Sequence, residues 1–176
     1  MQEKGKRIFH KFIEEKKKNL ILYMTIWTCL LVIGVLIGFS DIRIMIVCLV
    51  FGVTLGFLNI KAWIQYKKTI NSISDLEKLY GQLEKTDTNQ FKEWKLIITE
   101  EHVLSAFDTL QIIPFSDIQK VEIGIQESGL KPSKSLYITK KGISDKLQIA
   151  VAYSAADNPN EFYKAFDLIQ KKTTQK

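Results

Sequence analysis

Few side chains in this sequence are of the types that carry out catalysis, and they do not form a recognisable catalytic pattern. The candidates are His10, His102, the adjacent pair Glu100-Glu101, and Asp117. Catalysis needs a placed nucleophile, base or metal. Both histidines lie in segments expected to be solvated, and the two glutamates should point apart at a strand end. Asp117 is better explained as a turn residue that bonds backbone amides. We therefore predict that the protein is not an enzyme.

The sequence also predicts no metal and no cofactor. The two cysteines, Cys29 and Cys48, lie inside apolar runs, and their expected heights along two helices differ by about 9 Å, too far for an internal disulfide. With only two distant histidines beside them, no metal-ligand spacing exists. Glycine-rich phosphate loops, H-E-x-x-H and G-x-S-x-G are missing from the sequence.

Two long apolar segments dominate the first third of the chain. Leu20–Phe39 has 20 residues without a charge, and a helix of that length is about 30 Å long, the thickness of a bilayer's hydrocarbon core. Ile44–Ile60 has 17 residues between Arg43 and Lys61, whose side chains can snorkel to the interface. The pattern predicts a transmembrane hairpin over residues 19–66, with spans at 20–39 and 44–60.

Two other interpretations of these runs are weaker. Buried helices of soluble proteins are normally amphipathic, whereas both runs are apolar all round. A cleaved signal peptide has an apolar region of about 7–15 residues and a small-residue cleavage site. The first run is longer, lacks such a site and is followed at once by a second run.

The positive side chains predict the orientation of the hairpin. Residues 1–18 carry seven Lys and Arg against three Glu, residues 40–43 are neutral overall, and lysines return after the second run. The positive-inside rule then places both termini in the cytoplasm of a multi-pass cell-membrane protein. The side chains expected at the membrane interface are Lys11, Lys16, Lys17, Lys18, Lys61, Trp63 and Tyr66.

The net charge of +6 is concentrated near the first span, because from Lys67 onward 16 Lys face 15 Asp and Glu. A nearly neutral folded part argues against nucleic acid as a partner, and the excess charge suits the anionic inner leaflet of a lipid bilayer. Residues 1–18 form a basic cytoplasmic tail with apolar residues at helical spacing. A helix lying on the leaflet and a solvated, partly disordered tail both remain open.

Four glycines in the apolar runs are spaced as two G-x-x-x-G pairs, which let helix backbones approach closely. In a folded hairpin, Gly52 is expected level with Leu31, and Gly56 level with Trp27. The first pair then remains for another contact, such as a homo-oligomer, although glycine is also common in such helices without a packing role. The predicted helix-packing residues are Gly34, Gly38, Gly52 and Gly56.

Residues 67–88 are expected to form a linker helix, and residues 89–176 a folded domain. Ser74 and Glu77 have the spacing of a capping box ahead of an apolar stripe. From residue 91 the apolar period changes to two, which is typical of short antiparallel strands. The six strand-like segments are WKLIIT, VLSAF, LQIIP, IQKVEIGIQ, SLYIT and KLQIAVA.

A final helix is expected to begin at Asn158 and Pro159, a cap followed by a proline at the first helical position. It should bury one apolar face over an opening of the sheet. That face comprises Phe162, Phe166 and Ile169, with Ala165 and Tyr163 beside them. The predicted fold is a membrane α hairpin plus an α+β domain, a bent antiparallel β barrel or sandwich capped by a C-terminal helix.

This arrangement resembles a pleckstrin-homology (PH)-like domain. In LQIIPFSDIQKVEI (Leu110–Ile123), a strand ends in Ile-Pro, a Phe-Ser-Asp turn follows and the next strand begins. The pattern is similar to that of the bacterial PH-like and YcxB-like membrane proteins, which also place a transmembrane hairpin ahead of such a domain. The resemblance implies a PH-like fold for residues 89–176.

The resemblance further implies a membrane-anchored module that recruits or senses an unknown protein partner or the inner leaflet, in an envelope or bacteriocin-immunity role. PH domains that bind phosphoinositides carry Lys and Arg around the first hairpin loop. We expect that loop to be Thr99–His102, whose two glutamates argue against phosphoinositide recognition. The alternative is a hairpin that oligomerises through its glycines into a pore or a membrane-perturbing assembly.

Overall fold

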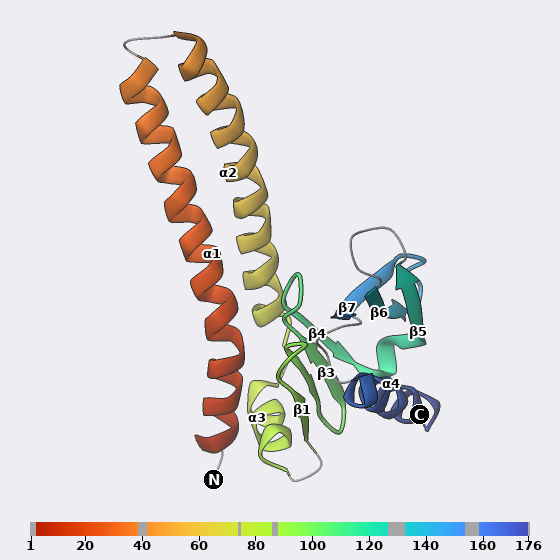
Figure 1. Ribbon diagram of the computed structural model, residues 1–176. Coiled ribbons are helices and arrows are strands. Elements are labelled where there is room, and N and C mark those ends of the chain that lie inside the picture. Colours follow the sequence, from red (N-terminus) through yellow and green to blue (C-terminus); the bar gives the residue numbers. More distant parts are fainter. Residues whose placement is uncertain are drawn as a thin grey trace. The chain divides into compact units, whose positions relative to one another are not determined.

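A computed structural model shows two long helices followed by strands and two shorter helices (Figure 1). It describes residues 3–38, 42–73, 75–85, 88–126, 133–153 and 159–175. The chain divides into two compact units, residues 13–71 and residues 1–12 together with 72–176. The predicted α+β layout is confirmed: an antiparallel sheet domain with a C-terminal helix follows the two apolar helices.

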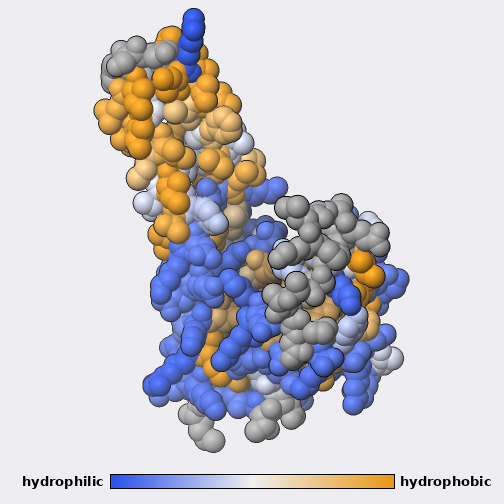
Figure 2. Space-filling view, in the orientation of Figure 1, coloured by the Kyte–Doolittle hydropathy of each residue, from blue (hydrophilic) through white to orange (hydrophobic). Residues whose placement is uncertain are grey.

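The two long helices, α1 (Glu3–Gly38) and α2 (Ile42–Asn71), are both long and apolar enough to cross a membrane. In each of them, only 11% of the most apolar stretch is buried. Figure 2 shows the apolar atoms of these helices on the outside, and side chains such as Phe57 are 68% exposed. The core helix of a soluble protein would bury such residues, so the exposure argues against that interpretation.

The start of α1 differs from the expected tail. The sequence predicts a separate amphipathic tail over residues 1–18, whereas α1 is one uninterrupted helix from Glu3 to Gly38. Two of the apolar side chains in this region are buried, Phe9 at 2% exposure and Ile13 at 8%. At the other end of the hairpin, α2 continues to Asn71, beyond the expected start of the linker at residue 67.

The linker helix α3 (Leu76–Glu84) is shorter than the range expected for it. Its N-cap is Asp75, whose carboxylate accepts a hydrogen bond from the backbone N–H of Lys78 at 2.8 Å. The predicted cap, Ser74, lies outside the described residues. Aspartate and serine cap helices about equally well, so residue type alone could not choose between adjacent positions. Leu79 and Leu83 are almost fully buried and fix the inward side of α3.

The strands form two antiparallel sheets, each with its strands in sequence order. The first consists of β1 (Asn89–Phe91), β2 (Leu96–Ile98), β3 (His102–Ser105) and β4 (Gln111–Pro114). The second consists of β5 (Ile118–Gln126), β6 (Ser133–Lys140) and β7 (Lys146–Tyr153). A single helical turn, η1 (Phe115–Asp117), connects the sheets at the Phe-Ser-Asp segment.

The strand β1, which the sequence pattern did not predict, changes which loop is the first hairpin loop of the domain. Because Phe91 of β1 pairs with Leu96 of β2, the first hairpin turn consists of residues 92–95. Thr99–His102, which the sequence suggested as the first loop, instead connects β2 and β3. The first turn contains Lys92 and Lys95 as well as one glutamate. The argument against phosphoinositide recognition from an acidic first loop is therefore wrong.

The main core lies between the two sheets and α4 (Pro159–Thr174), which begins at the predicted proline. Phe162 of α4 is 1% exposed, and its ring meets Trp94 edge-on at 5.5 Å between centroids. Burying a side chain of this size contributes about 1.5–3 kcal/mol. Tyr163, expected beside the buried face, is 40% exposed, and its hydroxyl accepts a hydrogen bond from Lys134 at 2.7 Å.

Candidate functional site

Trp27 joins the two apolar helices of the hairpin. Its indole Nε1 donates a hydrogen bond to the backbone carbonyl of Gly52. Its ring also occupies the space that a side chain at Gly56 would need, and Leu31 does the same at Gly52. Both contacts were predicted from the sequence, which places Gly52 level with Leu31 and Gly56 level with Trp27. The second glycine pair therefore receives bulky side chains from α1.

Gly34, the first glycine of the other pair, is already in contact with α2 of the same hairpin. A Cβ added at Gly34 would meet the Cβ of Cys48, so α2 fills this position from within the same hairpin. The surroundings of Gly38 lie outside the described residues. Cys48 is partly buried, Cys29 is exposed, and both are free thiols.

The threonine and asparagine side chains named next lie within the apolar runs and are bonded to their own helices. Thr25, Thr28, Thr54 and Asn59 each donate to the carbonyl four residues earlier, at 2.8–3.0 Å. A side chain satisfied in this way needs no partner from another helix. Because unsatisfied polar groups are costly in hydrocarbon, these bonds allow the outer surface of the hairpin to face lipid.

The predicted interface side chains lie on α1 and near the end of α2. Trp63 stacks on Tyr66 with ring centroids 5.6 Å apart, and the ammonium of Lys67 lies 5.5 Å from the Trp63 ring centre. Lys16 is half-buried, and the remaining predicted lysines are exposed: Lys11, Lys17, Lys18 and Lys61. The exposed lysines suit a lipid headgroup region, whereas Tyr66 is only 7% exposed and is therefore buried within the protein.

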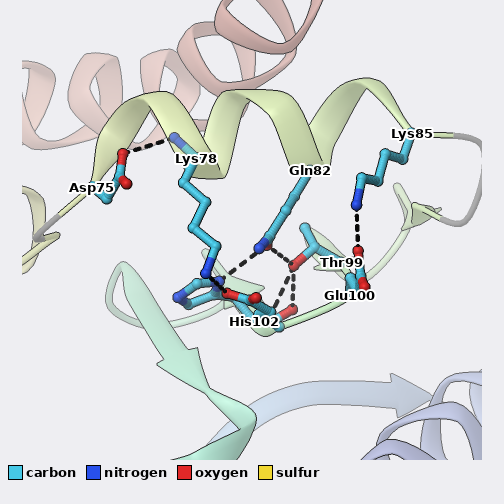
Figure 3. A network of polar contacts seen from close by, with 8 residues as sticks. Asp75, Lys78, Gln82, Lys85, Thr99, Glu100 and His102 are labelled. Atoms are coloured by element: carbon cyan, nitrogen blue, oxygen red, sulfur yellow. Dashed lines mark hydrogen bonds and ion pairs between the residues drawn. The ribbon is translucent and has the colours of Figure 1, made fainter.

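Apart from the hairpin, a cluster of polar side chains lies where α3 meets the turn between β2 and β3 (Figure 3). Gln82 of α3 is 4% exposed, and its Oε1 lies 3.0 Å from Thr99 Oγ1 and 3.2 Å from His102 Nδ1. Thr99 is fully buried, and its Oγ1 also accepts the His102 backbone N–H at 2.9 Å. Buried polar groups are stable only when hydrogen-bonded, so this triad holds α3 on the turn.

Two ion pairs flank the buried triad. Lys78 lies 2.8 Å from Glu101, and Lys85 lies 2.5 Å from Glu100, so the two carboxylates reach opposite ends of one helix. The hydrogen bond from Lys78 holds the pKa of Glu101 below its ordinary value, and that from Lys85 does the same to the pKa of Glu100. In return, Glu101 raises the pKa of Lys78.

The sequence did not identify the centre of this site. Gln82 follows Leu79 by three residues on an amphipathic helix, and this spacing was the only signal for its burial. Lys172 of α4 donates to the Thr99 carbonyl at 2.9 Å, which brings a third element to the turn. His102, expected to be solvated, is half-buried and bonded. Asp117 belongs to the η1 turn as expected, but its carboxylate accepts from the Ser116 hydroxyl at 3.1 Å, and it is the Asp117 backbone carbonyl that accepts an amide, the Lys141 N–H at 2.8 Å.

The lowered pKa of Glu101 predicts an acid-dependent stability. A carboxylate with a lowered pKa stabilises the fold above its unfolded value near 4.5, and the stabilisation is lost as the pH falls through the folded-state pKa. We expect Glu101→Gln to be less stable than the wild type at pH 6–7 and equal to it at the acidic end of a denaturation series. Glu93→Gln, in the exposed first turn, is the matched control and should follow the wild type throughout.

Comparison of the chain with protein families, curated proteins and solved structures finds no match. The resemblance to PH-like and YcxB-like membrane proteins therefore remains a prediction from the sequence pattern. Among the described residues, no group of three or more His, Cys, Asp or Glu side chains is positioned to hold a metal ion.

Proposed function

We propose that this chain is a non-enzymatic bacterial membrane module, in which a transmembrane hairpin anchors a PH-like cytoplasmic domain that recruits or senses a protein partner. The observation that carries the proposal is the exposed apolar surface of α1 and α2 in a chain whose sheets belong to a second compact unit. An envelope or immunity role follows from the resemblance alone.

The hairpin has the properties of a membrane anchor. Its outward side chains are apolar, and the polar ones named above bond their own helix. Side chains of α1 pack into the glycine positions of α2, so the two helices complete each other's surfaces. Close packing at small residues is what drives helix pairing in lipid, where the hydrophobic effect cannot.

The order of elements supports a PH-like domain. Four antiparallel strands form one sheet, three form the next, and one helix follows and covers the core between them. A fold of this type hosts many functions, so the assignment concerns architecture and not task.

The polar residues of the α3 site support a structural role over catalysis. Glu100 and Glu101 are each engaged by a lysine, and His102 is bonded to Gln82. The charge from Lys67 onward is almost balanced, which gives the domain little attraction for anionic lipid and favours a protein partner.

The hairpin contacts make the pore alternative weaker. Gly52 and Gly56 are occupied by Leu31 and Trp27, and Gly34 by Cys48, all from the same chain. A pore also needs polar side chains turned toward water, whereas the threonines of the spans are bonded to their own backbone. Oligomerisation through these three glycines would require the hairpin to open.

Cysteine labelling tests the anchor and its orientation. In a background with Cys29→Ala and Cys48→Ala, Ser40→Cys should react with a membrane-impermeant maleimide on intact spheroplasts, whereas Ser72→Cys should react only after lysis. The physical reason is the excess of Lys and Arg beside both outer ends of the hairpin. Labelling in the reverse order, or recovery of the protein in the membrane-free supernatant, would contradict the proposal.

Photo-crosslinking from the domain tests the recruiting role. A photoreactive residue at Ile143 or Ile125, which are 49% and 67% exposed, should yield discrete protein adducts in living cells. The control is Phe57, which is 68% exposed on α2 and should yield lipid adducts. If both domain positions yield only lipid adducts, the domain binds the inner leaflet and not a protein partner. The absence of adducts from both positions would contradict recruitment.

A further inference from the structure

The short helix α3 makes contacts on two nearly opposite faces. Lys78 and Gln82 are spaced four residues apart, so they share one face of α3, and this face meets the β2–β3 turn. Lys85, which directly follows α3, pairs with Glu100 of the same turn. Tyr80 and Glu84 are spaced four apart on another face, which meets the first turns of α1. Both contacts lie within the same compact unit, which includes residues 1–12 and 72–176.

The contact with α1 is close and specific. Glu84 Oε1 accepts hydrogen bonds from the backbone N–H groups of Lys4 and Gly5 at 2.9 and 3.0 Å. These N–H groups belong to the first turn of α1, where no carbonyl within the helix can accept them. Glu84 therefore caps α1 from a segment about 80 residues away in the sequence.

No space remains at Gly5 for a side chain. A Cβ built there would collide with the backbone carbonyl oxygen of Tyr80, and backbone cannot rotate away as a side chain can. One helical turn later, the buried Phe9 meets the Tyr80 ring edge-on, with centroids 5.6 Å apart. The two residues fix both the distance and the rotation of α1 against α3.

The helix between these two contacts is only marginally stable by itself. α3 has nine residues, and isolated helices shorter than about 12–15 residues are marginal in water. Its helical state therefore depends on the burial of Leu79 and Leu83 and on what the two contact faces bind. A contact that stabilises the helical state of α3 also favours the contact on the other face, because both require the same backbone conformation.

We propose that α3 is a reciprocal coupling element that links the docking of the start of α1 to the order of the β2–β3 turn. A change that releases residues 3–12 loosens α3 and thereby the Gln82–Thr99–His102 triad, and a change at the turn weakens the cap on α1. Because α1 continues unbroken to Gly38, this coupling would let the domain respond to its anchor. That role rests on the proposed membrane function, whereas the coupling itself does not.

Hydrogen exchange on the full chain in lipid nanodiscs tests the coupling. Gly5→Ala forces a methyl group against Tyr80, and an overpacked contact of this kind should raise the exchange rates of residues 76–84 and 99–105 about tenfold. The matched control is Gly81→Ala within α3, where an added Cβ meets nothing within 4 Å. It should leave these rates unchanged or lower them, since alanine favours the helix.

Two further variants keep the test decisive if Gly5→Ala folds poorly. Glu84→Gln keeps the shape of the cap and removes its charge, and should give the same pattern at about two- to fivefold. Thr99→Val removes the buried hydroxyl and should raise the exchange of residues 4–12, since coupling between two sites must act in both directions.

The outcomes separate the coupling from the proposed function. If Gly5→Ala and Glu84→Gln raise exchange only in residues 3–12, or Thr99→Val affects only the turn, then α3 does not couple its two faces. Either result would leave the labelling and crosslinking expectations untouched. Conversely, correct coupling in a chain that recruits no partner would remove the proposed function alone.

Discussion

Replacing Phe9 with alanine is expected to lower the free energy of unfolding of the sheet-containing unit by about 3–5 kcal/mol. Phe9 is 2% exposed and packs edge-on against Tyr80, so its removal leaves a cavity beneath α3. If the first turns of α1 lay on a membrane surface, the same change would weaken lipid binding and leave the unit's stability almost unaltered. The prediction therefore distinguishes a docked segment from a surface helix.

Pulse proteolysis of the full chain in nanodiscs across a urea gradient measures this difference, because the lipid protects the hairpin and cleavage reports the exposed unit. The matched control is Phe12→Ala, which removes an equal ring from a half-buried position three residues later. We expect a clearly smaller shift of the urea midpoint for the control. Equal shifts for the two variants would contradict the docking of Phe9 on α3.

Replacing Gly56 with leucine is expected to separate α1 from α2 along part of the hairpin. The new side chain would occupy the position of the Trp27 ring, and displacement of that ring would also break its hydrogen bond to Gly52. Overpacking of this kind typically costs about 1–3 kcal/mol. In a two-helix hairpin with few other specific contacts, that loss is large enough to allow several arrangements.

Spin labels at Val32 and Leu58, which are 54% and 55% exposed, can report the separation in nanodiscs on the same cysteine-free background. The wild-type distance distribution should be narrow, and Gly56→Leu should broaden it or shift it outward. Val53→Leu, at a position of the same helix that is 63% exposed, is the matched control and should leave the distribution unchanged. A narrow, unshifted distribution for Gly56→Leu would show that Trp27 does not set the pairing.

Patterns confined to one segment predicted much of the fold. Charge-free runs of helical length identified the apolar part of α1 and α2, and alternation with period two identified β2 to β7, because both depend on side chains within one element. β1 was missed because Asn89–Phe91 is short, and only Phe91 of its three residues is apolar. That omission displaced the first hairpin turn and led to the incorrect argument about its charge.

Contacts between distant segments could not be predicted. The apolar spacing of residues 8–13 indicated a helix, but it suggested a leaflet or solvent as its surroundings and not burial against α3, which begins more than 60 residues later. Glu84 bonds the N-terminus of α1, and Gln82 bonds the turn between β2 and β3. Neither contact produces a recognisable residue spacing in the sequence. By contrast, the contact between Trp27 and Gly56 could be predicted by counting residues from the connection, because a short connection fixes the depth of each residue in a hairpin.

The cap that Glu84 places on Lys4 and Gly5 also constrains the order in which the protein is assembled. These groups are separated by 80 and 79 residues, so at typical synthesis rates roughly 4–16 s pass between the making of one and the other. Both apolar runs are translated within that interval. The two apolar helices can therefore form before the sheet-containing unit is complete, and residues 3–12 can reach their buried positions only after α3 has been synthesised.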